Sequence, residues 1–170
     1  MTTVLAIDPG VKGAAAFVTV NGPKKYHVKV FDLSDAAALE TEIRENQGRI
    51  QAAWIEEPLG WHARNPKTGR PIPANVAGMI TLGKCAGYWL GFVRAHCPKA
   101  EYVNARIWQR PYLHLARRGK GQAKAAVRRY IETVLHCADL CTGPLGGWLD
   151  GRADAIAMGV ALAEQRQRIG

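Results

Sequence analysis

Short apolar runs separated by turn residues fill the first sixty positions of the chain and predict a β-sheet. The first run ends at Asp8-Pro9-Gly10, and the second ends at Asn21-Gly22, a dipeptide typical of β-hairpins. A third run alternates apolar and polar residues, as expected of a partner strand. A fourth apolar run ends before Pro58, and a fifth, shorter run follows later in the chain. Together with the first three, they predict five strands. Their ranges are 3–9, 13–20, 26–31, 52–57 and 100–104.

Four other segments have helical spacing of their apolar positions. The first begins behind Ser34, which is expected to be its N-cap, and the last has an apolar stripe expected to be buried. The helical ranges are 35–47, 74–96, 121–136 and 149–167. The order of strands and helices predicts an α/β fold with a mixed sheet, in a single domain over residues 1–170.

The helix expected over 74–96 contains the most apolar stretch of the chain. Its 18 residues from Val76 to Val93 are long enough to suggest a membrane span, but Lys84 and several glycines favour a buried core helix instead. Gly83, Gly87 and Gly91 recur every four residues and therefore share one face. That face is equally compatible with packing against the sheet and with packing against a second subunit.

Charge is distributed unevenly along the chain. The sequence holds 23 Lys and Arg against 14 Asp and Glu, and residues 61–130 alone hold 14 basic residues and only one acidic residue, Glu101. A basic middle between acidic ends indicates a polyanionic partner, and a solvated basic face is the alternative. The four cysteines and the lack of an export signal predict free thiols and a cytoplasmic location. Cys137 and Cys141 lack a second pair at zinc-site spacing.

Acidic residues occur where an apolar element ends or begins. Asp8 ends one strand, Glu56 and Glu57 end another, and Asp150 and Asp154 begin the last helix. Any one of them alone is more often structural, but adjacent strand ends and an i, i+4 helix pair bring such acids to one edge. Carboxylates gathered in this way repel one another unless cations neutralise them, and Mg²⁺ or Mn²⁺ suits oxygen ligands. The set predicts metal-dependent phosphodiester cleavage with two ions.

Three motifs in this order resemble those of the RuvC-type Holliday-junction resolvases, which belong to the RNase H-like nucleases. The motifs are Ile7-Asp8-Pro9-Gly10 with Gly13, then Ile55-Glu56-Glu57-Pro58, then Asp150-Gly151-Arg152-Ala153-Asp154-Ala155. The resemblance extends over nearly the whole chain, including the glycine-rich helix and the helix that contains Lys124. It implies a five-stranded mixed sheet flanked by helices, with the first three strands antiparallel. It also implies a homodimer that binds four-way DNA junctions and nicks two symmetry-related strands.

The resemblance assigns individual roles as well. Asp8, Glu56, Asp150 and Asp154 match the four metal-binding acids, and Lys124 matches a basic catalytic residue. Glu57 competes with Glu56 for its role, and the motif match favours Glu56. The usual last motif separates its acids by three residues, whereas here the separation is four and Gly151 takes the nearer place. A second basic residue aligns near Gln109, where Arg110 is the candidate substitute.

The expected DNA contacts come mostly from basic residues that neutralise phosphates. Trp61 is expected either to stack on an unpaired base or to fold back onto the surface. The basic candidates are Arg64, Lys67, Arg70, Arg110, Arg117, Arg118, Lys120, Lys124, Arg128 and Arg129. Three alternatives to a resolvase stay open: an RNase H-like nuclease acting on RNA–DNA hybrids or branched replication intermediates, a non-enzymatic basic binding domain, and half of an actin-like kinase. The chain is short for the last of these.

Overall fold

The fold is built on a five-stranded mixed sheet. The computed structural model describes residues 2–22, 25–58, 76–116 and 121–169. The strands are β1 (Thr2–Asp8), β2 (Ala14–Val20), β3 (Tyr26–Asp32), β4 (Ile50–Glu56) and β5 (Ala100–Val103), in the spatial order β3-β2-β1-β4-β5. The first three strands are antiparallel, and β4 and β5 run parallel to β1. This arrangement confirms the predicted α/β mixed sheet.

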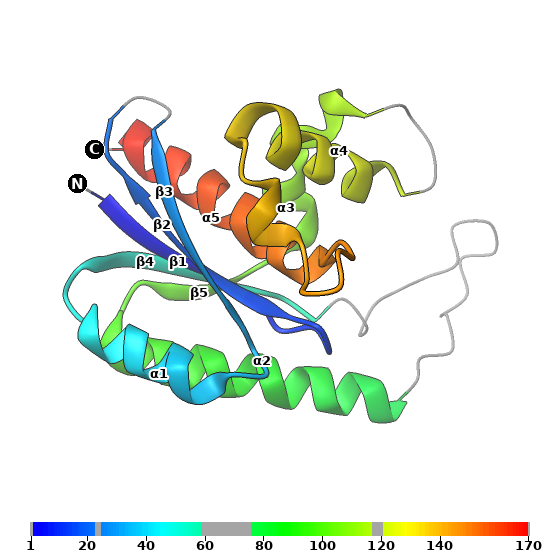
Figure 1. The fold of residues 1–170 in the computed structure, drawn as a ribbon. Coiled ribbons are helices and arrows are strands. Elements are labelled where there is room, and N and C mark those ends of the chain that lie inside the picture. The colour runs from blue at the N-terminus through cyan, green and yellow to red at the C-terminus, as the bar shows by residue number, and fades with distance from the viewer. Residues whose placement is uncertain (1, 23–24, 59–75, 117–120, 170) are drawn as a thin grey trace.

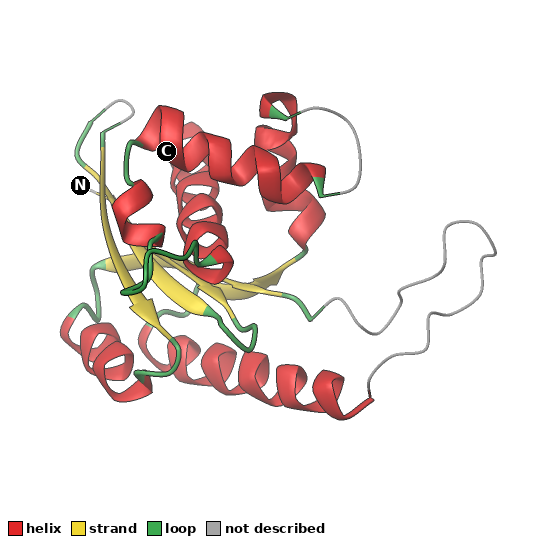
Figure 2. Ribbon diagram, turned by 45° about the vertical axis from the view of Figure 1, so that its right-hand side comes forward, coloured by secondary structure: helices red, strands yellow, loops and turns green. Residues whose placement is uncertain are grey.

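Helices cover both faces of the sheet, which gives three layers (Figures 1 and 2). On one face lie α1 (Ala36–Glu45) and the long α2 (Val76–His96). On the other lie α5 (Asp150–Ile169), α3 (Ala105–Gln109) and α4 (Gln122–Tyr130). Three short segments complete this second layer: a 3-10 turn over Arg110–Leu115, a π-helical turn over Ile131–Leu135 and a 3-10 turn over Ala138–Cys141. The helix expected over 121–136 therefore ends as regular α-helix at Tyr130.

Alternation along the strands divides the apolar residues between two cores. In β1, Leu5 and Ile7 pack into the core beneath α1 and α2, whereas Val4 and Ala6 pack into the core beneath α5. All four side chains are fully buried. Helix α5 sits close to the sheet at Gly159, where an added Cβ would lie 2.6 Å from a methyl carbon of Val18. A larger residue at this position would push the helix, and the acids at its start, away from the strands.

Helix α2 is a surface helix and not the buried core helix that its composition suggested. Ala86, Trp89 and Val93 are buried against the sheet, while Gly87 and Gly91 lie on the exposed side with no atom within 4 Å of an added Cβ. Gly87 and Gly91 therefore do not pack against the sheet, whereas Gly83 is half-buried. Within the described ranges, no helix is long and apolar enough to cross a membrane.

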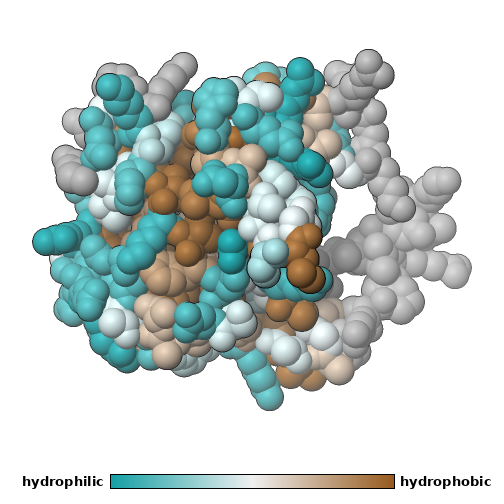
Figure 3. All heavy atoms as spheres, in the orientation of Figure 1, coloured by the Kyte–Doolittle hydropathy of each residue, from teal (hydrophilic) through white to brown (hydrophobic). Residues whose placement is uncertain are grey.

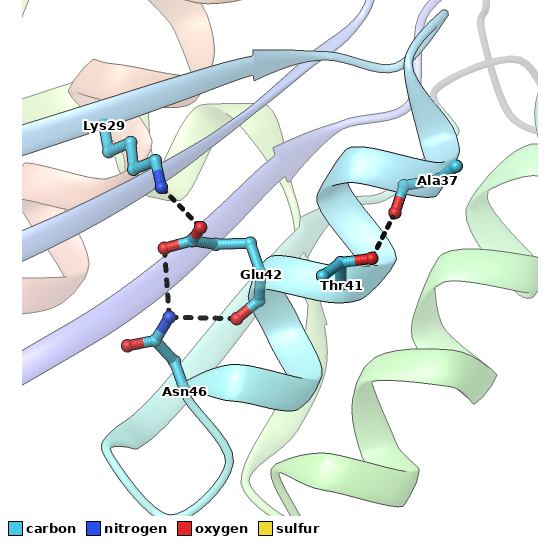
Figure 4. Close-up of polar contacts among 5 residues, drawn as sticks. All are labelled: Lys29, Ala37, Thr41, Glu42 and Asn46. Carbon is cyan, nitrogen blue, oxygen red and sulfur yellow. Dashed lines mark hydrogen bonds and ion pairs between the residues drawn. The ribbon is translucent and has the colours of Figure 1, made fainter.

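The prediction about the start of the first helix needs correction. Helix α1 is capped by Asp35 and not by Ser34, because the Ala38 N–H donates to Asp35 Oδ1 at 3.4 Å. Its far end is fixed by Asn46, which donates to the backbone and side-chain oxygens of Glu42 at 2.9 and 3.0 Å, while Glu42 also pairs with Lys29 on β3 (Figure 4).

Helix α3 was not predicted. Asn104, directly after β5, is its N-cap and accepts a hydrogen bond from the Arg106 N–H at 3.0 Å. Asparagine is among the preferred capping residues, so this start carried a local signal.

Candidate active site

Asp8 and Glu56 end two neighbouring parallel strands. β1 and β4 pair with Ile7 opposite Ile55, so the next residue of each strand lies at the same edge of the sheet. Because Ile7 and Ile55 both face the core beneath α1 and α2, alternation turns both carboxylates to the opposite face, which α5 covers. The strand register alone therefore brings the first two predicted acids together.

The turn after β1 holds Asp8 in place. The Gly10 N–H donates to Asp8 Oδ1 at 2.9 Å, and the Gly13 N–H donates to the Gly10 carbonyl at 2.8 Å. A Cβ at Gly13 would lie 2.1 Å from the Asp8 carbonyl oxygen. Only glycine fits there, which gives a steric reason for Gly13 in the first motif.

Glu57 differs from Glu56 in both direction and exposure. Its backbone N–H donates to the Val103 carbonyl at 2.8 Å, and its exposed side chain accepts a 3.5 Å hydrogen bond from Asn104. Glu56 is half-buried, and the charges of Asp8 and Asp154 act on it. Of the two glutamates, Glu56 is therefore the one on the same side of the sheet as the other acids.

The first two turns of α5 supply the remaining acids in two environments. Asp154 is half-buried, whereas Asp150 is exposed. Between them, Gly151 is buried against the turn after β1: an added Cβ would lie 2.1 Å from the Lys12 carbonyl oxygen and 3.2 Å from Asp8 Oδ2. The backbone of Lys12 thus excludes any side chain at position 151, where the usual motif would carry its acid.

Lys124 reaches the site from the first turn of α4. Its Nζ lies 2.5 Å from Asp150 Oδ2, and the two side chains are 64% and 53% exposed. The hydrogen bond to Asp150 raises the pKa of Lys124, and the charges of Asp154 and Asp8 raise it further while burial opposes them. Lys124 is therefore a positive charge that acts on all four predicted acids, since it also lowers the pKa of Glu56 against the effect of burial.

The carboxyls deeper in the site strongly disfavour ionisation. Burial raises the pKa of Glu56 to about 8, with the charges of Asp8 and Asp154 adding to the effect. Burial also raises the pKa of Asp154 to about 7, again with Asp8 as the next cause. For Asp8, burial raises the pKa, and the Gly10 N–H and Lys124 partly offset it. Such a group of acids needs either protons or nearby cations at neutral pH.

The overall fold is similar to that of two solved Thermus thermophilus RuvC structures. The one in complex with a Holliday junction substrate aligns with a TM-score of 0.59 and 15% identity, covering 99% of this chain and 96% of that chain. The other aligns with a TM-score of 0.53 and 16% identity, covering 98% and 96%. The chain has the RuvC fold. No protein-family model and no curated protein sequence matches it.

In this RuvC fold, the acids fit a divalent cation by their donor chemistry. All are carboxylates, the ligands that Mg²⁺ and Mn²⁺ take, and burial beside one another makes neutralisation favourable for Asp8, Glu56 and Asp154. Across the ranges that the structure describes, no three His, Cys, Asp or Glu side chains converge tightly enough to form a metal centre. Carboxylates without a cation between them repel one another, and this repulsion opposes the close convergence of the acids that a bound metal ion requires.

An ion pair that the sequence did not reveal anchors the start of α5. Arg152 Nε and Nη2 donate to the two carboxylate oxygens of Asp32 at 2.7 and 2.6 Å, and Arg152 Nη1 donates to the Leu140 carbonyl at 3.2 Å. This bidentate hydrogen bond lowers the pKa of Asp32. It fixes the helix that carries Asp150 and Asp154 to the end of β3. Nothing in the local sequence links two residues that are 120 positions apart.

The predicted DNA-contact residues are only partly described. Arg110, Lys124, Arg128 and Arg129 are exposed, and Arg128 also forms an ion pair with Glu132 at 2.8 Å. Lys124, Arg128 and Arg129 all belong to α4, and Arg110 begins the 3-10 turn after α3. Seven other candidates lie outside the described residues: Trp61, Arg64, Lys67, Arg70, Arg117, Arg118 and Lys120.

Proposed function

We propose that this chain is a divalent-metal-dependent endonuclease that resolves four-way DNA junctions by paired symmetric nicks, in DNA recombination and repair. The observation that carries the proposal is the group of half-buried acids Asp8, Glu56 and Asp154, which faces Lys124 at one edge of a RuvC fold. One of the aligned RuvC structures is bound to a Holliday junction substrate. The net charge of +9 favours a polyanionic substrate.

Asp8, Glu56, Asp154 and Asp150 would hold two Mg²⁺ ions, with Mn²⁺ as a substitute. Such ions, when bound, lower the pKa of an attacking water and stabilise the leaving oxygen of the phosphodiester. Asp8 and Glu56 are positioned for this role by rigid strand ends, and Asp154 by a helix packed on the same strands. Hydrolysis then leaves a 5′-phosphate and a 3′-hydroxyl and needs no covalent bond to the enzyme.

Lys124 would contact the scissile phosphate. Its ammonium group is held by the exposed carboxylate of Asp150 and faces solvent, where a phosphate oxygen can reach it. A cation at this place compensates charge that develops on the phosphate during cleavage. Arg110, Arg128 and the other basic candidates would bind the DNA backbone without reading its sequence.

Paired nicking requires two copies of the site related by symmetry. The exposed glycine face of α2, with Gly87 and Gly91, allows close approach of a second backbone, and the exposed Ile80 and Tyr88 add apolar surface on the same helix. We therefore place the homodimer contact on α2. A two-fold dimer also matches the symmetry of a four-way junction.

Cleavage assays on three labelled substrates test the proposal: a synthetic four-way junction, a linear duplex and an RNA–DNA hybrid. Each is incubated with the wild-type chain in Mg²⁺ and in EDTA, and with an Asp154→Asn variant in Mg²⁺. We expect symmetric nicks in opposite junction arms only for the wild type in Mg²⁺, with a loss of roughly a hundredfold to a thousandfold on substitution, the range for removing one charge-stabilising group. Cleavage of the hybrid with an intact junction would instead assign an RNase H-like activity to the same acids.

A further inference from the structure

A short hairpin leads directly into α5 beside the acidic site. Thr142 and Trp148 form an antiparallel bridge, the Gly143 N–H donates to the Gly147 carbonyl at 2.8 Å, and the Gly146 N–H donates to the Gly143 carbonyl at 2.9 Å. Gly146 has a φ of 78°, in the left-handed region. This is the pattern of a three-residue hairpin loop, in which a β-turn is followed by a left-handed glycine.

Leu145 lies at the tip of this hairpin and is 99% exposed. Pro144 precedes it at the turn position where its fixed φ is favourable, so the tip is held in one backbone conformation. The hairpin is fixed from below as well, because the Leu149 N–H donates to the carbonyl of the fully buried Cys141 at 2.8 Å. The hydrogen-bonded hairpin thus holds a large apolar side chain in solvent.

The base of the hairpin borders on the basic helix α4. Trp148 packs against the core beneath α5, and the guanidinium of Arg128 lies 4.7 Å from the centre of its ring. The hairpin segment from Thr142 to Leu149 contains no charged residue. Apolar surface appears at this place in Figure 3, over the loop that precedes α5 and among more hydrophilic side chains.

The tip lies within reach of a strand bound at the acids. Leu145 is five residues before Asp150, and five residues span at most about 17 Å even when fully extended. That distance corresponds to about five base steps along one DNA strand, at roughly 3.4 Å each. A DNA strand whose phosphate contacts Lys124, beside Asp150, therefore has neighbouring bases within this distance of the hairpin tip.

The small size of the exposed surface at Leu145 distinguishes between a protein partner and a nucleic acid partner. A stable protein–protein interface needs roughly 20–30 residues on each side, which one hairpin tip does not supply. An apolar wedge between two bases needs only one side chain, flanked by cations that bind the phosphates. Arg128 and Lys124 are such cations on the neighbouring helix.

We propose that Leu145 is a wedge that enters the base stack next to the phosphate bound at the acidic site and unstacks one base step there. The inference rests on the proposed nuclease function, but it concerns a hairpin outside the acidic site. Unstacking would favour branched DNA, where bases at the branch point are already less well stacked than in a duplex. The hairpin would therefore contribute to the choice of substrate.

Fluorescence of 2-aminopurine tests this, since the base brightens when it is unstacked. It is placed next to the expected cleavage step in a four-way junction and, separately, in an RNA–DNA hybrid, with Ca²⁺ replacing Mg²⁺ during binding and Mg²⁺ restored for cleavage. The variants are Leu145→Ser, the conservative Leu145→Met, and Val134→Ser as a control, because Val134 is another exposed apolar side chain, 51% exposed, in the turn over Ile131–Leu135 and not in the hairpin. Thermal unfolding checks that each variant is folded.

We expect Leu145→Ser to lose most of the fluorescence rise and to slow cleavage about tenfold, the order of one lost contact in the transition state. Leu145→Met and Val134→Ser should both behave like the wild type. Equal fluorescence from wild type and Leu145→Ser on the nucleic acid that the chain binds would overturn the wedge and leave the nuclease proposal intact. If the wild type binds only the hybrid, the proposal that the substrate is a four-way junction is overturned. The fluorescence of the 2-aminopurine in the hybrid then tests whether Leu145 unstacks a base. Binding to neither would overturn both.

Discussion

The acids at the edge of the sheet fall into two groups that differ in burial. Asp8, Glu56 and Asp154 are half-buried, and burial raises the pKa of each. Asp150 is exposed and forms an ion pair with Lys124. The first group is therefore costly to the fold unless something neutralises it, while the fourth acid has its own counter-charge. If the proposed cations bind, the three half-buried acids gain most from them, whereas Asp150 already has a lysine beside it.

The exposed position of the fourth acid, Asp150, has a steric cause at the start of α5. If position 151 carried the acid, its side chain would collide with the Lys12 carbonyl, 2.1 Å from the Cβ. The acid stands one residue earlier instead, at the exposed first position of the helix, where Lys124 can reach it. At position 150 the carboxylate therefore lies in an exposed ion pair and not among the half-buried acids.

We expect the largest effect on the cleavage rate from Glu56, and the adjacent Glu57 provides the comparison. Glu56→Gln should reduce junction cleavage about a thousandfold or more, because it removes an acid from the buried group. Glu57→Gln should change the rate less than about threefold, since its side chain is exposed and turned away from that group. Single-turnover cleavage of a labelled junction measures both rates.

Junction binding by Glu56→Gln serves as the control for folding and should equal or exceed that of the wild type, because repulsion from phosphate falls. If Glu57→Gln were the more damaging variant, the strand alternation used here to separate the two residues would be wrong.

Asp150 and Lys124 should show a smaller, shared effect. We expect Asp150→Asn and Lys124→Gln each to slow cleavage about tenfold to a hundredfold, the range of one positioned charged group. If their ion pair acts as a unit, the double variant should be no slower than the worse single variant. Single-turnover cleavage rates of the wild type, the two single variants and the double variant form the double-mutant cycle that measures this coupling. A thousandfold loss in Asp150→Asn alone would place Asp150 with the buried acids.

Sequence patterns predicted the parts of this site that follow from local periodicity and chain order. Asp8 and Glu56 could be paired in advance because parallel strand ends meet at one edge, and the five strands themselves were recognisable. Neither the exclusion at Gly151 nor the ion pair of Asp32 with Arg152 could be predicted, because each depends on contacts between distant segments. The tip at Leu145 carried a turn signal in Pro144 and its glycines, but exposure of the leucine is a tertiary property.

The last expected effect concerns the stability of the fold and not the rate of cleavage, and its sign follows from the raised pKa of Asp154. The folded protein holds a proton on this carboxyl up to a pH of about 7, whereas the unfolded chain releases it near its ordinary value of about 4. Without metal, the folded state therefore loses stability as pH rises from about 4 to about 7. Asp154→Asn removes this loss, so in EDTA it should be more stable than the wild type at pH 8, by an amount of order 2–4 kcal/mol.

Thermal unfolding in EDTA at pH 5 and pH 8 measures that difference, at roughly 2–4 °C per kcal/mol for a chain of this size. The advantage of Asp154→Asn should be larger at pH 8 than at pH 5, because the folded wild type must release the Asp154 proton between these two pH values. Added Mg²⁺ should stabilise the wild type more than Asp154→Asn, since a cation that binds only the folded acids shifts unfolding by mass action. A constant advantage at both pH values would mean that Asp154 ionises freely in the folded protein, and the contrast between the buried and the exposed acids would then be lost.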